Sequence, residues 1–406
     1  MKHSNAVLIV ATMDTKNMEA IFIKERLEGI GIEVLIMDAG IRGESPVQVD
    51  ISRHDVAGAS GRTIEKVQDI GHEGEALDVM IQGAVDCARD LYKQGRITGV
   101  LGIGGSMGTT LGTAVMRSFP VGFPKVMIST MASRDTRAFV GTKDILMLHS
   151  VCDISGINRI TEKVLHNGAM AMAGMLRHEL PPTPREKPLV FISTLGTTEA
   201  CVKRLKKHLE DKGKEVVVFH TVGAGGRAME EMINEEDVAA VVDLSLHEIA
   251  DNLFGGDYDA GPDRGENALH KGVPCILVPG NIDFLVTGHL KEARRRFPDR
   301  PYHKHNAAIT VLRTNRMEME ILAQRFAFLV KSAEGPVSVL VPMGGFSAFD
   351  SRGGPLYDPE APVIFAEALE NALPVGAPIE KLPYHVNDEE FSVALLRTLE
   401  SVMDAG

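Results

Sequence analysis

Short, continuous apolar runs alternate along the chain with longer stretches in which apolar residues recur every three or four positions. A run that is apolar on both faces is typical of a strand covered by helices on both sides of a parallel sheet. The longer stretches have the spacing of an amphipathic helix. The alternation therefore predicts an α/β protein built from parallel, doubly wound sheets.

The predicted elements fill both halves of the chain. The first half has predicted strands at 6–11, 33–38, 99–103, 125–129 and 145–151, and predicted helices at 16–29, 73–94, 106–118 and 157–177. The second half has predicted strands at 189–194, 215–220, 239–244, 274–279, 309–313 and 337–342. Two stretches rich in Gly, Asp and Arg, 255–268 and 343–360, fit neither pattern, and long loops of this kind often carry function.

The two halves begin with similar sequences. Thr12 corresponds to Thr194, and Gly31 to Gly213, at a constant spacing of 182 residues. An ungapped match over about 35 residues indicates an internal duplication. The Pro-rich segment 180–188 would break a helix and has little to bury, so it is interpreted as the linker between an N-terminal domain, 1–181, and a C-terminal domain, 188–406.

Composition narrows the function classes. A formal net charge of −12 argues against a general nucleic-acid-binding protein, and the short basic runs are interpreted as solvated helix faces. No apolar stretch approaches the roughly 20 residues of a membrane span, and no targeting signal is recognised, so a cytoplasmic protein without membrane contact is expected. The four cysteines are scattered and suggest neither disulfides nor a zinc site.

A glycine-rich segment, residues 102–110, leaves one predicted strand and starts a predicted helix. Free amides at a helix start, together with the hydroxyl of Ser106, are suited to a phosphate or a carboxylate. The segment lacks the Gly-Lys-Ser/Thr ending of a Walker A loop and the spacing of the dinucleotide fingerprint. Anion binding at Gly104, Gly105 and Ser106 and a tight packing turn are both compatible with this pattern.

Other predicted strand ends also carry polar residues. Because the carboxyl ends of parallel strands meet at one edge of a sheet, these residues predict a binding crevice for a phosphorylated ligand. Asp14 is equally compatible with a helix N-cap. In the first domain the candidate cofactor-binding residues are Asp14, Thr15, Lys16, Gly104, Gly105, Ser106, Ser129, Thr130 and Ser133. In the second domain the candidate substrate-binding residues are Gly225, Gly226, Arg227 and Arg264.

An ordered set of motifs across the chain resembles the family whose best-known member is the plant resistance protein against tomato mosaic virus, and whose bacterial members carry an uncharacterised-protein-family label. The motifs are residues 14–16, 104–106, 129–133, 149–150, 219–220, 225–230, 260–264, 303–306 and 357–361. The resemblance extends from Val7 to Phe391. It implies two Rossmann-like domains, binding of ATP and Mg²⁺, and a homodimer. In the plant protein the corresponding region binds and inhibits a viral replication protein.

The chain departs from the family pattern at both domain starts. Ala11-Thr12 stands where the family more often has Gly-Thr, and residues 196–201 replace a Gly-Met-Thr-Thr-Pro-Cys sequence. Glu199 would bring negative charge close to a phosphate in that second loop. ATP is therefore assigned to the first domain.

The second domain has more candidates for acid or base chemistry. His220, Asp263 and His305 are the candidate catalytic residues, and no metal ligands are assigned. His220 is also compatible with a buried, satisfied histidine, Asp263-Arg264 with a surface ion pair, and His305 with a loop hydrogen bond.

Three functions remain open. One is a metabolic enzyme that uses ATP on a small carboxylate or phosphorylated metabolite in a cleft between the domains. Another is a non-catalytic, nucleotide-dependent binding or regulatory protein. A third is a sugar-phosphate or acyl-group enzyme whose glycine-rich loop holds the substrate itself.

Overall fold

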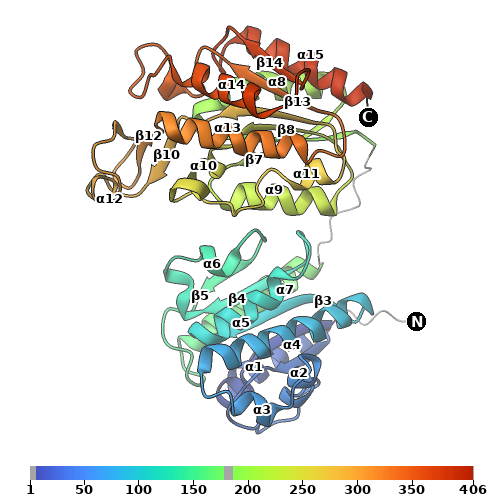
Figure 1. Ribbon diagram of the computed structural model, residues 1–406. Helices are drawn as coiled ribbons and strands as arrows, with labels where there is room; N and C mark the ends of the chain where they lie inside the picture. Colours follow the sequence, from blue (N-terminus) through green and yellow to red (C-terminus); the bar gives the residue numbers. More distant parts are fainter. Residues whose placement is uncertain (1–5, 178–185, 406) are drawn as a thin grey trace. The chain divides into compact units, whose positions relative to one another are not determined.

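The computed structural model describes residues 6–177 and 186–405 and separates into two compact units, Met1–Pro182 and Thr183–Gly406 (Figure 1). Most of the predicted linker, 180–185, lies outside the described residues. None of the described helices has the length and hydrophobicity that a membrane span requires.

Unit 1 contains a five-stranded parallel sheet with the strand order β2-β1-β3-β4-β5. The strands are β1 (Ala6–Ala11), β2 (Val34–Asp38), β3 (Ile97–Gly104), β4 (Lys125–Ser129) and β5 (Leu146–His149). The first three are buried along almost their whole length, as their continuous apolar runs predict.

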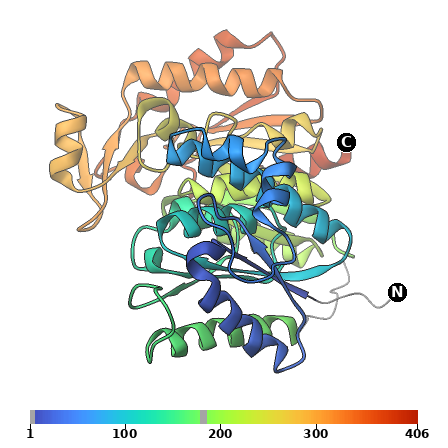
Figure 2. The same ribbon diagram turned by 90° about the horizontal axis from the view of Figure 1, so that it is seen from below.

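Helices cover both faces of this sheet (Figures 1 and 2). One face packs against α1 (Met13–Glu28) and α7 (Thr161–Arg177). The other face packs against α2 (Arg53–Ala59), α3 (Ile64–Gln68), α4 (Glu73–Lys93) and α5 (Ser106–Arg117). A short helix, α6 (Arg137–Val140), and the 3₁₀ turn η1 (Thr130–Ser133) follow β4.

Unit 2 contains a six-stranded parallel sheet with the order β14-β13-β9-β8-β6-β7. The strands are β6 (Leu189–Thr194), β7 (Glu215–His220), β8 (Val238–Ser245), β9 (Cys275–Gly280), β13 (Val337–Pro342) and β14 (Ile379–Leu382). One face carries α8 (Glu199–Asp211) and α15 (Glu389–Ala405). The other carries α9 (Ala224–Glu235), α10 (His247–Phe254), α11 (Asn267–His270), α13 (Arg316–Lys331) and α14 (Ala361–Ala372).

The two sheets share one topology. Read from its β7 edge, the unit 2 sheet repeats the order of unit 1 and adds β14 at the far edge. Gly31 and Gly213, which correspond in sequence, both have positive φ angles, 83° and 77°, in the turn before the second strand. The architecture is therefore two Rossmann-like, doubly wound units with matching strand order, as the duplication predicts.

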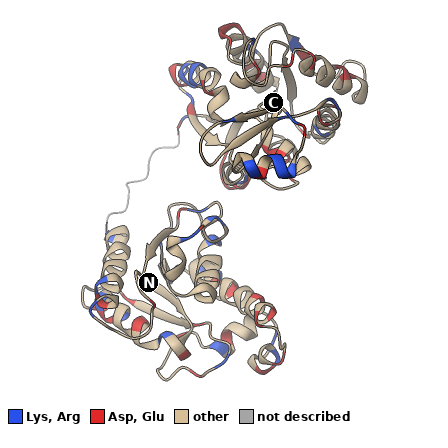
Figure 3. Ribbon diagram, turned by 90° about the vertical axis from the view of Figure 1, so that its left-hand side faces the viewer, with Lys and Arg blue, Asp and Glu red and all other residues tan. Residues whose placement is uncertain are grey.

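The strand predicted at 309–313 is present, but it does not join the parallel sheet of unit 2. Residues Thr310–Arg313 form β12, which pairs antiparallel with β10 (Phe284–Thr287) and β11 (Tyr302–Lys304) in a separate three-stranded sheet. This sheet and α12 (Leu290–Arg296) form a projecting arm, residues 284–313. Figure 3 marks several Lys and Arg positions in blue on the ribbon of the arm helix, where Arg295 pairs with Glu292 on the same helix.

Candidate functional site

A cavity of about 610 Å³ opens in unit 1 at the carboxyl ends of β1 and β3. The connections after these neighbouring strands lead to α1 on one face of the sheet and to α5 on the other. This is the topological switch point of the sheet, where doubly wound proteins bind their ligands. The cavity is therefore the candidate functional site of unit 1.

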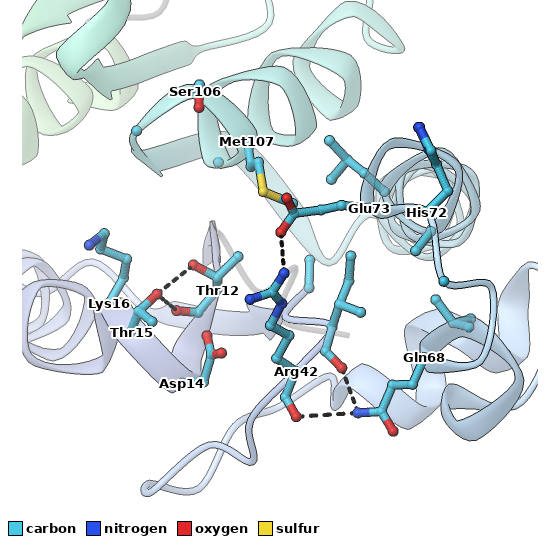
Figure 4. A pocket seen from close by; sticks show the side chains of 18 residues that line it. Thr12, Asp14, Thr15, Lys16, Arg42, Gln68, His72, Glu73, Ser106 and Met107 are labelled. Carbon is cyan, nitrogen blue, oxygen red and sulfur yellow. Dashed lines mark hydrogen bonds and ion pairs between the residues drawn. The ribbon is translucent and has the colours of Figure 1, made fainter.

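The first wall of the pocket is the start of α5. Gly105 is the N-cap, no side chain caps this helix, and Ser106, Met107 and Gly108 line the cavity (Figure 4). Uncapped amides and the helix dipole give this wall a partial positive charge. A Cβ on Gly104 would lie 2.7 Å from the Gly108 Cα, so that glycine permits close packing of strand and helix.

The second wall is the start of α1. The Thr12 and Thr15 hydroxyls lie 3.1 Å apart, and the Lys16 Nζ donates to the Ile154 carbonyl at 2.6 Å. The Asp14 carboxylate accepts from the Gly43 amide at 3.2 Å. Behind this wall, Asp38 accepts from the amides of Met13 and Gly40, and burial raises the pKa of its carboxyl.

The third wall comes from residues 39–77, which run from the end of β2 into the first turns of α4. The Arg42 Nη2 donates to the Glu73 carboxylate at 2.8 Å, and the Gln68 amide donates to the Ile41 carbonyl at 2.7 Å (Figure 4). Apolar side chains complete this side of the cavity: Ile41, Val67, Ala76 and Leu77. The pocket therefore has one end lined by amides, hydroxyls and Lys16, and another lined by apolar side chains and an ion pair.

The structure brings part of the predicted cofactor set together. Asp14, Thr15, Lys16, Gly105 and Ser106 line the pocket. Among the remaining predicted residues, which do not line it, Ser129 is fully buried and its hydroxyl caps the 3₁₀ turn that contains Thr130 and Ser133. Sequence reasoning missed the third wall, although Ser52 and Thr63 carry the signals of helix N-caps in that region.

In unit 2, three of the predicted substrate-binding residues, Arg264, Gly225 and Gly226, are part of the packed interior. Arg264 is 1% exposed, and its guanidinium donates to Asp243 and to Glu248 at 2.7 Å each. It also pairs with Glu230. Burial raises the pKa of both glutamates. The Asp263-Arg264 surface ion pair expected as an alternative is also wrong, because Arg264 is enclosed in this carboxylate cluster.

The glycines at the start of α9 serve the same cluster. The amides of Gly223 and Gly226 donate to the Glu248 carboxylate at 2.7 and 3.1 Å. A Cβ on Gly225 would overlap the His220 carbonyl oxygen, and one on Gly226 would overlap the Glu248 carboxylate. The helix start predicted to bind an anion is therefore occupied by a carboxylate of the protein itself.

The other predicted residues of unit 2 are all exposed: His220, Arg227, Asp263 and His305. The alternative interpretation of His220 as a buried histidine is wrong, because His220 is exposed. The neighbouring His247 is buried, and its Nε2 lies 2.6 Å from the Thr221 carbonyl. Burial lowers the pKa of His247 to about 4. Within the described residues, no group of three or more His, Cys, Asp or Glu side chains is arranged to hold a metal ion.

Comparison with protein families gives a match along both units. Residues 5–181 match the N-terminal domain, and residues 187–403 the C-terminal domain, of the uncharacterised protein family UPF0261. The chain belongs to this family.

Relatives are found in bacteria and in a plant. A UPF0261 protein of Clostridium tetani is 37% identical over 98% of this chain and 99% of its own length. The tomato ToMV susceptible protein tm-1(GCR26) is 32% identical over 97% of this chain, which spans 55% of the tomato protein. The solved structure of a Streptomyces glycosyltransferase, SsfS6, aligns over 98% of this chain and 96% of its own at 12% identity, with a TM-score of 0.20.

Proposed function

We propose that unit 1 binds ATP with Mg²⁺ in the pocket between α1 and α5, and that the protein is a metabolic enzyme acting on a small carboxylate or a phosphorylated metabolite. The observation that carries the nucleotide assignment is the uncapped start of α5 within a pocket at the switch point. Amides there suit phosphates, and the Lys16 ammonium lies on the opposite wall. The apolar side of the third wall is suited to a nucleobase.

Magnesium fits this pocket only as a companion of the phosphates. Mg²⁺ keeps several waters and takes one or two protein carboxylates together with phosphate oxygens. Asp14 is the carboxylate beside the phosphate end, and its position on α1 allows that role. Bound between the phosphate oxygens and the Asp14 carboxylate, the Mg²⁺ ion would reduce the repulsion between these negative charges.

The alternative function is a nucleotide-dependent regulatory protein without turnover. The lining of the pocket supports this alternative, because it consists mainly of groups that can bind a ligand: amides, hydroxyls, Lys16 and apolar side chains. The candidate bases His220 and His305 belong to the other unit. Phosphate release, measured with the purified protein, ATP and a metabolite panel, distinguishes an enzyme from a regulatory protein without turnover.

The homodimer implied by the family resemblance stays a prediction. Sedimentation of the purified protein tests it.

The decisive experiment is calorimetric ATP titration of a Gly105 series. A Cβ at Gly105 meets only the Thr130 hydroxyl, at 3.9 Å, and the residue has φ −79°, so side chains are tolerated there. Gly105→Asp places a carboxylate against the phosphates and should cost at least about 2 kcal/mol of ATP binding. Gly105→Asn, of equal size and without charge, should cost clearly less. Equal affinity in wild type and Gly105→Asp would show that this loop does not hold the phosphates.

A further inference from the structure

A second polar cluster lies in unit 2, beside the carboxyl ends of β9 and β13. Its members are Asp283, Arg313 and Asp350, all at most 5% exposed. The Arg313 Nη1 donates to the Asp350 carboxylate and to the Leu356 carbonyl, each at 2.8 Å. The Asp283 Oδ2 accepts from the Ser347 hydroxyl at 2.7 Å and lies 3.6 Å from the Arg313 Nη1.

Three polar atoms of this cluster are buried and have no partner among the described residues. They are the Nε and Nη2 of Arg313 and the Oδ1 of Asp283. Buried polar groups are nearly always hydrogen-bonded, so an unpaired set at one place calls for an explanation. On a guanidinium, Nε and Nη2 form the edge that binds a carboxylate with two parallel hydrogen bonds.

The segment 343–360, which we call the cover segment, encloses the cluster. It contains one short 3₁₀ turn, Ala348–Asp350, and four glycines. The cluster itself fastens it, because Asp350 accepts from the amides of Phe346 and Asp358 and Arg313 binds Leu356. The Nε and Nη2 atoms of Arg313 are unpaired but buried. A ligand can therefore reach them only when the cover segment moves.

We propose that the cover segment and the arm enclose a binding site for a carboxylate-bearing small molecule, whose carboxylate is held by the Nε and Nη2 edge of Arg313. A singly charged carboxylate fits better than phosphate because Asp283 and Asp350 already place negative charge beside the guanidinium. The site rests on unit 2 residues alone. It names the substrate class of the proposed enzyme and does not depend on the nucleotide pocket.

Proton binding accompanies ligand binding at this site. Burial, and then the nearby Asp350, raise the pKa of Asp283 to about 7, while Arg313 acts in the opposite direction. Histidines lie around the cover segment: His303 and His305 contact the Phe349 ring, and His385 contacts the Ser347 carbonyl. His247 contacts the ring of Phe284, the residue after Asp283. A bound carboxylate favours protonated Asp283, whose unpaired oxygen can then donate to it.

The test observes the Arg313 Nε–H signal of the full chain in proton–nitrogen NMR spectra. Sodium acetate and sodium malonate are titrated at constant ionic strength, with sodium chloride and inorganic phosphate as comparisons. We expect a saturable shift of this signal with a carboxylate and none with chloride. The dissociation constant should rise about tenfold between pH 6 and pH 8, as Asp283 loses its proton.

Three variants test whether a shift of the Arg313 Nε–H signal reports carboxylate binding at this cluster. Arg313→Lys keeps the charge, removes the two-donor edge and should weaken carboxylate binding at least tenfold. Asp283→Asn should abolish most of the pH dependence while the chain stays folded. Gly105→Asp, in the other unit, should leave carboxylate binding unchanged even where ATP binding is lost. The Nε–H signal is also assignable through bonds, so the test stands if Arg313→Lys fails to fold.

Two outcomes overturn the proposal. A Nε–H signal that no carboxylate moves would make the cluster a closed structural feature. A signal that phosphate moves and carboxylates do not would refute the ligand class.

Discussion

Single glycines in the two units differ in what surrounds them, and this decides how each tolerates a side chain. Gly225 lies against the His220 carbonyl, at the tight junction between β7 and α9. Gly58 lies inside α2, and a Cβ added there would meet no other atom within 4 Å. The two glycines therefore differ in the space available for a side chain: Gly58 has room for one and Gly225 does not.

We expect Gly225→Ala to destabilise the chain by about 1–3 kcal/mol, because the methyl group forces the helix away from the strand. Gly58→Ala is the matched control and should be neutral or stabilising by up to about 1 kcal/mol, since Ala favours the helix. Urea unfolding monitored by circular dichroism measures both. Equal stability of the two variants would contradict the packing assigned to Gly225.

Asp283 should make stability depend on pH. Its pKa in the folded chain is raised from 3.8 to about 7, so the folded state binds the proton more tightly than the unfolded state. This group's contribution is therefore fully present below about pH 4 and is lost as pH rises toward 7. Asp283→Asn should become progressively more stable relative to wild type over that window.

Denaturant unfolding at several pH values checks this, with Asp135→Asn as a control of opposite sign. The Arg137 side chain lowers the pKa of the exposed Asp135 to about 2, so any contribution of Asp135 is lost as pH falls. A constant difference between wild type and Asp283→Asn from pH 4 to 7 would show that Asp283 titrates normally.

Sequence reasoning identified those residues of the unit 1 pocket that follow the ends of strands. Lys16, Gly105 and Ser106 follow the ends of β1 and β3, so topology alone places them together. Arg42 and Gln68 come from an intervening segment whose path over the sheet edge no local pattern encodes. The Arg264 cluster was missed for a similar reason, because its carboxylates are distant in sequence and meet only after folding.

At the scale of elements, sequence analysis predicted the strands of both parallel sheets except β14, and it did not predict β10 and β11 of the arm. β1, β6 and β9 read as continuous apolar runs because helices cover both of their faces. β14 has the sequence IEKL at a sheet edge, and this offers no such run. β12 is a fully buried run, but it packs in the antiparallel arm, which a periodicity argument does not distinguish from a central strand.

The attachment of the arm to α13 can be tested at the helix start. Asn315 caps α13 in a capping box with Glu318, and Glu318 also binds Arg300 of the arm at 2.6 Å. Asn315→Ala should cost about 1 kcal/mol through the lost cap. Asn315→Asp keeps an accepting oxygen and should retain most of the stability. Chemical denaturation measures both, and an unaffected Asn315→Ala variant would contradict the role of the cap.

At the scale of the whole molecule, the duplication has preserved the topology and changed the chemistry of the sheet edges. Unit 1 has an open pocket at the carboxyl ends of β1 and β3, and the equivalent strands of unit 2 are β6 and β8. The hydroxyls of Thr197, Thr198 and Ser245 are bound by the Asn281 side chain at the edge of the unit 2 sheet. Unit 1 thus has an open pocket at this position, and unit 2 has a closed network of hydrogen bonds.

Each unit should fold by itself. The core clusters of unit 1 draw on residues 6–176 and those of unit 2 on residues 189–403, so each sheet has a complete set of covering helices within its own unit. Domains of this size bury enough surface to be stable alone. We expect residues 1–181 and 188–406, expressed separately, to show cooperative thermal unfolding and native far-ultraviolet circular dichroism. The 1–181 fragment should bind ATP within about threefold of the full chain, and the 188–406 fragment should not bind it. A 1–181 fragment that folds cooperatively but has lost ATP binding would show that the nucleotide site requires residues of unit 2.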